Sequence, residues 1–179
     1  MHIPDGFVSA PVAAAGYVVA GIVLAIAVRQ ANRKFQERLV PLMGVMAAFI
    51  FAAQMMNFPV AGGTSGHMLG AALATILVGP WAAIIVMACV VGVQALIFQD
   101  GGLAALGTNL VNMAVVGVLV SYAVYRVAGA LVGDNRRLKY VAAFCASWLS
   151  MEAAALACSF ELATSGTSPL HVVLPAMAG

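Results

Sequence analysis

Long apolar stretches fill most of the chain, and short polar segments separate them. Apolar residues run almost without a break over 11–28, 41–56, 81–98, 103–127 and 140–162, and a shorter run covers 67–78. A helix needs about 20 mostly apolar residues to cross a membrane. The pattern therefore predicts an all-α, polytopic transmembrane helical bundle with six full spans. The last run, 171–179, predicts the start of a seventh, truncated helix near the C-terminus.

The composition places most of the chain in lipid. Hydrophobic residues make up 64% and charged residues 8%, whereas soluble domains hold roughly 45–50% and about 25%. We expect a single integral membrane domain over residues 1–179, in contact with membrane lipid. The net charge of +2 comes from few basic residues, and it gives no reason to expect nucleic acid as a partner.

The basic residues indicate the topology. All eight lie in or beside two connections, one after the first span and one after the fifth: Arg29, Arg33, Lys34, Arg38, Arg126, Arg136, Arg137 and Lys139. With six spans these connections share one side, which the positive-inside rule makes cytoplasmic. We therefore expect a multi-pass protein of the cell membrane with an extracytoplasmic N-terminus. The loops at 57–67, 99–108 and 163–170 would lie on that outer side.

The chain begins with a potential metal chelate. An initiator methionine is normally retained before a residue as large as histidine, so the Met1 amine, the His2 amide and the His2 imidazole stand side by side. Amine and amide would close a five-membered ring on a metal, and amide and Nδ1 a six-membered ring. One position of the plane remains for a second imidazole, and His67 lies on the same predicted side of the membrane.

Four nitrogens in a plane select among metals. The arrangement suits Ni(II) or Cu(II), Co(II) less well, and Zn(II), Mg²⁺ and Ca²⁺ poorly. Taken alone, however, His2 could equally be a solvated terminal residue, and His67 a polar cap of a helix at the membrane interface. We expect His67 to open the third helix, on which Gly66, Gly70 and Ala74 would share one packing face.

Three segments carry a resemblance to a known family. They are Met1-His-Ile-Pro-Asp-Gly-Phe7, Asn57-Phe-Pro-Val-Ala-Gly-Gly-Thr-Ser-Gly-His-Met-Leu-Gly70 and Phe98-Gln-Asp-Gly-Gly-Leu-Ala-Ala-Leu-Gly107. Nearly the whole chain resembles the nickel/cobalt substrate-binding membrane subunits (S components) of energy-coupling factor (ECF) transporters, the NikM/CbiM family. The resemblance implies a bundle with one N-terminal helix added to the usual six. It also implies that an N-terminal segment, residues 1–9, binds metal and is inserted into the outer cavity.

The resemblance implies a ligand set and partners as well. The metal ligands would be the Met1 amine, the His2 amide and imidazole, and His67, with Ni²⁺ favoured as bound substrate and Co²⁺ a close second. The implied partners are a transmembrane coupling (T) subunit, two cytoplasmic ATPase subunits and a small additional membrane component. Polar residues on the outer side could orient the ligands by hydrogen bonding: Asp5, Asn57, Ser65, Gln99, Asp100 and Asn109.

Two other functions stay open as alternatives to a non-enzymatic transport component. A metal-dependent integral membrane enzyme needs an open coordination position with an acid or base beside it, and no H-E-x-x-H or G-x-S-x-G pattern occurs. A self-sufficient secondary metal carrier typically has paired broken helices with intramembrane acids, and here only Glu152 lies mid-span. Because the chain lacks G-x-x-x-x-G-K-[ST], any ATP hydrolysis would fall to a partner.

Overall fold

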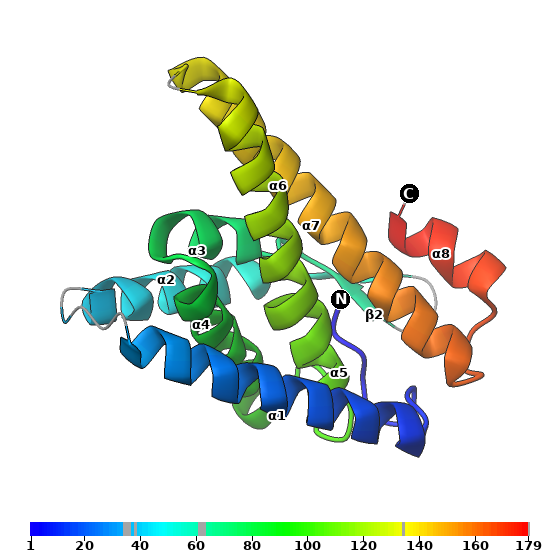
Figure 1. Ribbon diagram of the computed structural model, residues 1–179. Coiled ribbons are helices and arrows are strands. Elements are labelled where there is room, and N and C mark those ends of the chain that lie inside the picture. The colour runs from blue at the N-terminus through cyan, green and yellow to red at the C-terminus, as the bar shows by residue number, and fades with distance from the viewer. Residues whose placement is uncertain (34–36, 38, 61–63, 134, 179) are drawn as a thin grey trace.

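Helices make up nearly all of the regular structure (Figure 1), as the apolar pattern predicted. The computed structural model describes residues 1–33, 37, 39–60, 64–133 and 135–178. The helices within these residues are α1 (Ala10–Arg33), α2 (Leu39–Gln54), α3 (Ala71–Val78), α4 (Pro80–Val93), α5 (Leu106–Leu110), α6 (Gly117–Val132), α7 (Arg136–Thr164) and α8 (Leu170–Ala178). Two π-helical segments continue them: η1 (Gln94–Phe98) prolongs α4, and η2 (Val111–Val116) joins α5 to α6.

Four helical stretches among the described residues are long and apolar enough to cross a membrane: Ala10–Arg33, Pro80–Phe98, Leu106–Leu131 and Arg136–Thr164. α2 is a shorter apolar helix of 16 residues, and α3 has eight. The predicted count of six full spans and a seventh is therefore not confirmed. α3 ends early because Gly79, at φ +81°, redirects the backbone and Pro80 starts the next helix.

The segment before α3 differs from the prediction. Within it, β1 (Phe58–Val60) and β2 (Thr64–Gly66) pair antiparallel, with Phe58 opposite Gly66. His67 follows β2 outside any helix or strand, and α3 begins only after Gly70, which has φ +78°. The expected helical packing face of Gly66, Gly70 and Ala74 was therefore wrong. Gly66 instead lies against the Phe58 ring, where a β-carbon would clash.

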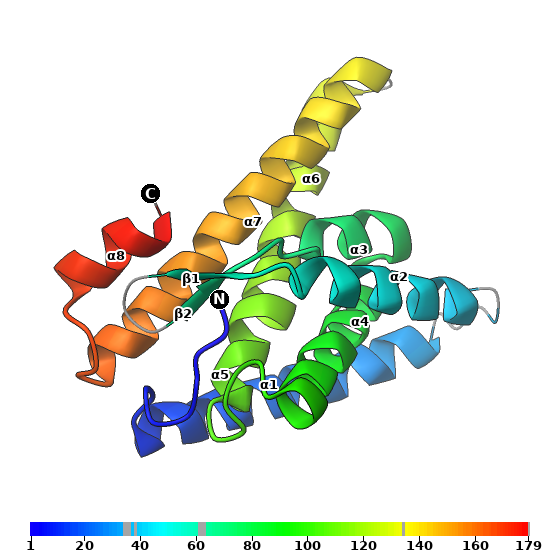
Figure 2. The ribbon, with the colours of Figure 1, turned by 180° about the vertical axis from the view of Figure 1, so that it is seen from behind.

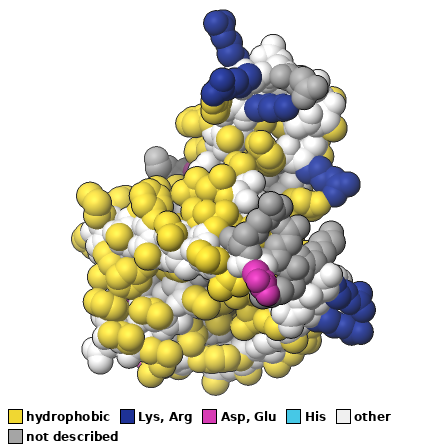
Figure 3. All heavy atoms as spheres, turned by 90° about the vertical axis from the view of Figure 1, so that its left-hand side faces the viewer, with side chains coloured by type: hydrophobic (Ala, Val, Ile, Leu, Met, Phe, Trp, Pro, Cys, Tyr) yellow, Lys and Arg dark blue, Asp and Glu magenta, His cyan; other side chains and the backbone are white. Residues whose placement is uncertain are grey.

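The ends of the helices that carry the basic residues lie apart from the N-terminus. In Figures 1 and 2, the end of α1 with the start of α2, and the end of α6 with the start of α7, lie on one side, and the N-terminal residues and the α7–α8 turn lie toward the other. Apolar side chains cover most of the face in Figure 3, and Lys and Arg gather at its margins. The basic residues and the N-terminal segment therefore lie at different ends of the bundle, and the side of the membrane that each end faces stays a prediction. Of the charged residues beside the two connections, Lys34, Arg38 and Asp134 lie outside the described residues.

The first residues of the chain belong to the core. Met1 is 3% exposed and packs in the main apolar cluster with residues of α2, α4 and α6. Ile3 is fully buried in a second cluster, whose other members are Ala105, Cys158, Leu162 and Val173. The N-terminus therefore lies between helices that are distant from it in sequence.

Candidate metal-binding site

Asp5 ties the N-terminal segment to the loop that leads into α5. Its carboxylate accepts the backbone N–H groups of Leu103, Ala104 and Ala105 at 3.1, 2.7 and 3.4 Å. The three N–H groups belong to the turn that precedes α5, so Asp5 fixes this turn from a distant segment of the chain. Gly102 permits this approach because a β-carbon at that position would collide with the Asp5 carboxylate.

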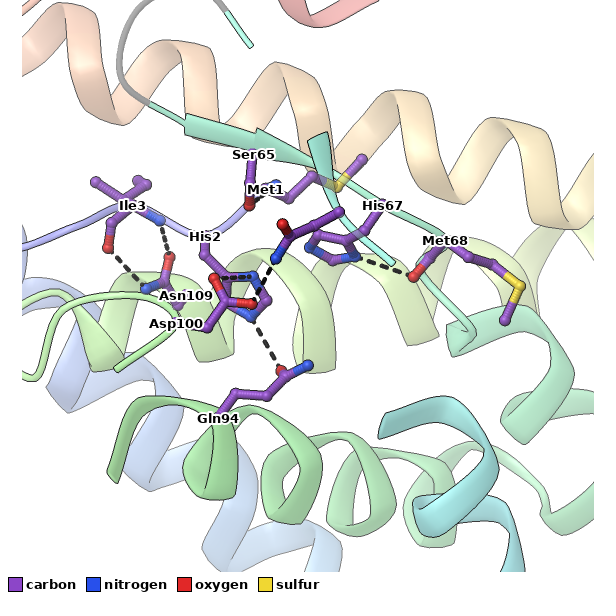
Figure 4. Close-up of polar contacts among 10 residues, drawn as sticks. Met1, His2, Ile3, Ser65, His67, Met68, Gln94, Asp100 and Asn109 are labelled. Atoms are coloured by element: carbon purple, nitrogen blue, oxygen red, sulfur yellow. Dashed lines mark hydrogen bonds and ion pairs between the residues drawn. The ribbon is translucent and has the colours of Figure 1, made fainter. Parts of the chain in front are cut away.

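Asn109, fully buried in α5, forms hydrogen bonds with the backbone of Ile3 (Figure 4). Its Oδ1 accepts the Ile3 N–H at 2.8 Å, and its Nδ2 donates to the Ile3 carbonyl at 3.0 Å. The Gly102 N–H donates to the same carbonyl at 2.9 Å. Both peptide groups that flank Ile3 are thus held by hydrogen bonds, which fixes the backbone next to His2.

The turn between α7 and α8 holds the other end of the segment. The Thr167 hydroxyl donates to the Phe7 carbonyl at 2.6 Å, and the Ser9 N–H donates to Ser165 Oγ at 3.0 Å. The buried Ile3 side chain, with Phe7 and Val8, packs in the second apolar cluster. The segment is therefore anchored by apolar side chains as well as by polar contacts.

The His2 ring is oriented by a residue of η1. His2 is 3% exposed, and its Nε2 lies 3.0 Å from Oε1 of the fully buried Gln94. Because an amide oxygen only accepts, Nε2 carries the proton, and Nδ1 of the neutral ring has a free lone pair. Nδ1 has no hydrogen-bond partner, and a carboxylate oxygen of Asp100 lies 3.5 Å from it.

The His67 ring is oriented in the complementary way. His67 is 2% exposed, and its Nδ1 donates to the Met68 carbonyl at 3.0 Å, which leaves Nε2 with a free lone pair. That Nε2 also has no hydrogen-bond partner. The His2 and His67 rings are 4.7 Å apart between centroids and tilted by 31° (Figure 4). Two buried imidazoles therefore stand side by side, each with one unpaired nitrogen.

The terminal amine completes the group of nitrogen donors. The Met1 amine donates to Ser65 Oγ at 3.4 Å. Burial lowers the pKa of this amine from 8.0 to about 6. Burial, and next the neighbouring amine, lower the pKa of His2 from 6.5 to about 4 and that of His67 to about 3. At neutral pH the three groups are therefore mostly unprotonated, and their lone pairs are available.

The structure brings the three predicted ligand residues together. Among the described residues, His, Cys, Asp and Glu side chains form no group of three or more that could hold a metal. The donors gathered here are two imidazoles together with main-chain nitrogens, the Met1 amine and the His2 amide. Of the predicted outer partners, Ser65 lies beside the amine and Asp100 beside His2. Asn57 donates to Asp100 at 3.0 Å and not to an imidazole.

The remaining predicted partners act elsewhere. Asp5 and Asn109 hold backbone groups, as described above, and Gln99 is exposed, at φ +54°, on an outer depression of about 340 Å³. The imidazole partner that sequence reasoning missed is Gln94. Its one signal was a polar residue near the outer end of the apolar run at 81–98. The Met68 carbonyl, which orients His67, has no sequence signal because every residue carries that group.

Comparison with known proteins gives matches to proteins described as cobalt or nickel transport components. The family model CbiM, described as cobalt uptake substrate-specific transmembrane region, matches residues 2–179. A protein of Archaeoglobus fulgidus, named as a fused nickel transport protein NikMN, is 44% identical over 179 residues, which cover 99% of this chain and 58% of the relative. The fused nickel transport protein NikMN of Rhodobacter capsulatus is 36% identical, with 99% of this chain and 55% of the relative covered. This chain thus spans less than two thirds of either relative.

A solved structure shares the fold. The crystal structure of a truncated transition metal transporter matches with a TM-score of 0.91 and 36% sequence identity. The match covers 99% of this chain and 87% of that one. The arrangement of helices around the N-terminal segment is therefore shared over almost the entire chain.

Proposed function

Since the chain belongs to the CbiM family, the cobalt uptake substrate-specific transmembrane region, as its resemblance predicted, we propose that it is the substrate-binding membrane component of an ECF-type transporter for nickel or cobalt. It captures the divalent ion at the extracytoplasmic face of the cell membrane. The N-terminal segment supplies most of the ligands, and the rest of the bundle positions that segment against His67. The nickel transport named in both relatives supports this choice of substrate.

The observation that carries the proposal is the pair of unpaired nitrogens, His2 Nδ1 and His67 Nε2, beside the buried amine. Buried polar atoms without partners are rare in folded proteins, and a metal ion would satisfy both at once. His2 Nδ1 is the nitrogen that can share a six-membered chelate ring with the His2 amide. The Met1 amine adds the five-membered ring, and His67 Nε2 takes the fourth position of the plane.

This donor set favours nickel. Displacing an amide proton requires a metal high in the Irving–Williams order, and four nitrogens in a plane match the square-planar preference of Ni(II). Co(II) accepts the same ligands less well and is the second substrate we propose. With its plane filled by protein nitrogens, the ion has no open in-plane position for a reacting molecule, which favours capture over catalysis.

Transport then requires partners. We propose a transmembrane coupling subunit, two cytoplasmic ATPases and a small additional membrane component, in keeping with the longer, fused relatives. The positive-inside rule supports an outer N-terminus, because the basic residues lie away from it. Among the described residues, the acids within the candidate membrane helices that a secondary carrier could use are Glu152, half-buried in the middle of α7, and Glu161 near the end of α7.

Blocking the Met1 amine tests the proposal. Protein purified with a free N-terminus and a C-terminal tag is compared with protein acetylated at the amine, and with a variant carrying a flexible, histidine-free N-terminal extension. We expect Ni²⁺ to bind the free form with a visible absorption band of square-planar nickel, and both blocked forms to lose that band and the bound metal. His67→Ala should also lose affinity, whereas His171→Ala, an exposed histidine at the start of α8, is the matched control. Equal binding by free and blocked forms would rule out the amine as a ligand.

A further inference from the structure

Asp100 brings one carboxylate to the nitrogen donors. Its Oδ1 lies 3.5 Å from His2 Nδ1, and its Oδ2 accepts from Asn57 Nδ2 at 3.0 Å. Its backbone N–H donates to the Gln94 carbonyl at 3.0 Å. The side chain is 16% exposed, so the carboxylate lies at the margin of the buried site and is fixed from two directions.

The influence of this carboxylate extends beyond His2. Its negative charge favours the protonated forms of both the Met1 amine and His67, against the larger effect of burial. The charge of Asp100 therefore acts on the amine and on His67, and its carboxylate lies beside His2. The other carboxylates on described residues have different roles or places: Asp5 accepts backbone N–H groups of the turn before α5, Glu161 accepts from Asn112, Glu152 lies mid-helix, and Glu37 lies between α1 and α2.

A charge count shows what the site requires. A divalent ion bound by an amine, two neutral imidazoles and one deprotonated amide leaves a net charge of +1. A buried charge without a counter-charge is strongly disfavoured. We propose that Asp100 is the counter-charge that neutralises the loaded site, while it stays outside the four in-plane ligands. This inference rests on the proposed function, because it concerns the same metal.

The geometry supports a counter-charge in preference to a fifth ligand. One carboxylate oxygen is already bound by Asn57, which precedes the β-hairpin. The other faces the nitrogen that would bind the metal, so a metal at Nδ1 would lie within a few ångströms of the negative charge. The Asn57 hydrogen bond thereby links the residue before β1 to the Asp100 carboxylate.

The experiment replaces the charge and keeps the shape. Nickel affinity is measured by calorimetry on full-length protein with a free N-terminus in lipid nanodiscs, for wild type, Asp100→Asn, Asp100→Glu and Glu37→Gln, which removes an equal charge from the α1–α2 connection. Unit charges about 4 Å apart predict a loss of about a thousandfold at an effective dielectric constant near 20 and of about fivefold at that of water. Because the Asp100 side chain is partly exposed, we expect Asp100→Asn to bind Ni²⁺ about ten- to hundredfold more weakly, between these limits. We expect the absorption band at saturating nickel to be unchanged, Asp100→Glu to recover most of the affinity, and Glu37→Gln to match wild type.

Two results would overturn the counter-charge. Asp100→Asn affinity within about threefold of wild type would show that the charge is not needed, since the Coulomb term predicts a larger loss. A shifted absorption band in Asp100→Asn would show that Asp100 is itself a ligand. Failure of wild type to bind nickel would instead contradict the proposed function, so the two ideas fail separately.

Discussion

Removing the Asn109 amide should release the N-terminal segment. In Asn109→Ala the buried Ile3 N–H loses its acceptor, and the Ile3 carbonyl keeps only the Gly102 donor. An unsatisfied buried donor is unfavourable by roughly 1–3 kcal/mol, and a lost hydrogen bond adds about 1 kcal/mol. We therefore expect the seated form of the segment to become about 2–4 kcal/mol less stable relative to a released form.

The effect on nickel binding follows from this shift. Because the chelate needs the seated segment, the apparent dissociation constant rises as the seated fraction falls. A shift of about 2–4 kcal/mol corresponds to an affinity loss of about 30- to 900-fold as an upper limit, reached when the released form predominates without metal. A protein whose segment stays mostly seated would show a smaller loss.

Two assays measure the release. Calorimetry gives nickel affinity, and intact-mass spectrometry follows acylation of the Met1 amine in metal-free protein, which should be faster in Asn109→Ala. The matched control is Asn112→Ala, because Asn112 is equally buried and donates to Glu161 at 2.6 Å. Unchanged affinity and unchanged amine protection in Asn109→Ala would refute the role of the clamp. Equal losses in Asn112→Ala would assign the effect to general destabilisation.

Two further predictions concern the ligands themselves. Gln94→Leu removes the acceptor that orients the His2 ring at similar side-chain volume, so nickel affinity should fall about 10- to 100-fold; calorimetry checks this against Gln30→Leu near the far end of α1, and equal affinities would contradict the orienting role. Because burial lowers the pKa of the Met1 amine to about 6 and of His2 to about 4, protons compete with nickel for these two groups only below those values, whereas the amide proton is displaced over the whole range. The affinity should therefore rise with pH by about one proton, from the amide, above pH 6.5, and more steeply below pH 6; a two-proton slope up to pH 8 would indicate a solvated amine.

Part of the site could be predicted because its chemistry is local. The sizes of the chelate rings follow from the covalent order of the Met1 amine, the His2 amide and the His2 imidazole, whatever the fold. The apolar composition predicted a membrane protein. The positions of the basic residues predicted that His67 and the N-terminus lie on the same side of the membrane. The structure accordingly places Met1, His2 and His67 together. Their role as ligands remains a prediction for the experiments above.

Other parts depended on contacts that no local pattern records. Gln94 orients a ring 92 residues away in sequence, and it lies there because η1 continues α4 toward the site. Asn109 resembled a possible imidazole partner, but it binds the backbone of Ile3, 106 residues away. His67 is not at a helix start, because the strand pairing of Phe58 with Gly66 continues up to it and α3 begins later.

The sequence by itself thus determined the membrane class, the family and the atoms able to chelate, because these depend on composition and on neighbouring residues. The tertiary structure decided which ring nitrogens stay unpaired, what anchors the N-terminal segment and which carboxylate approaches the donors. Those features arise when the N-terminal segment, the hairpin, η1 and α5 pack together. Packing distances between remote segments follow from the whole bundle, and no single segment of the chain contains them.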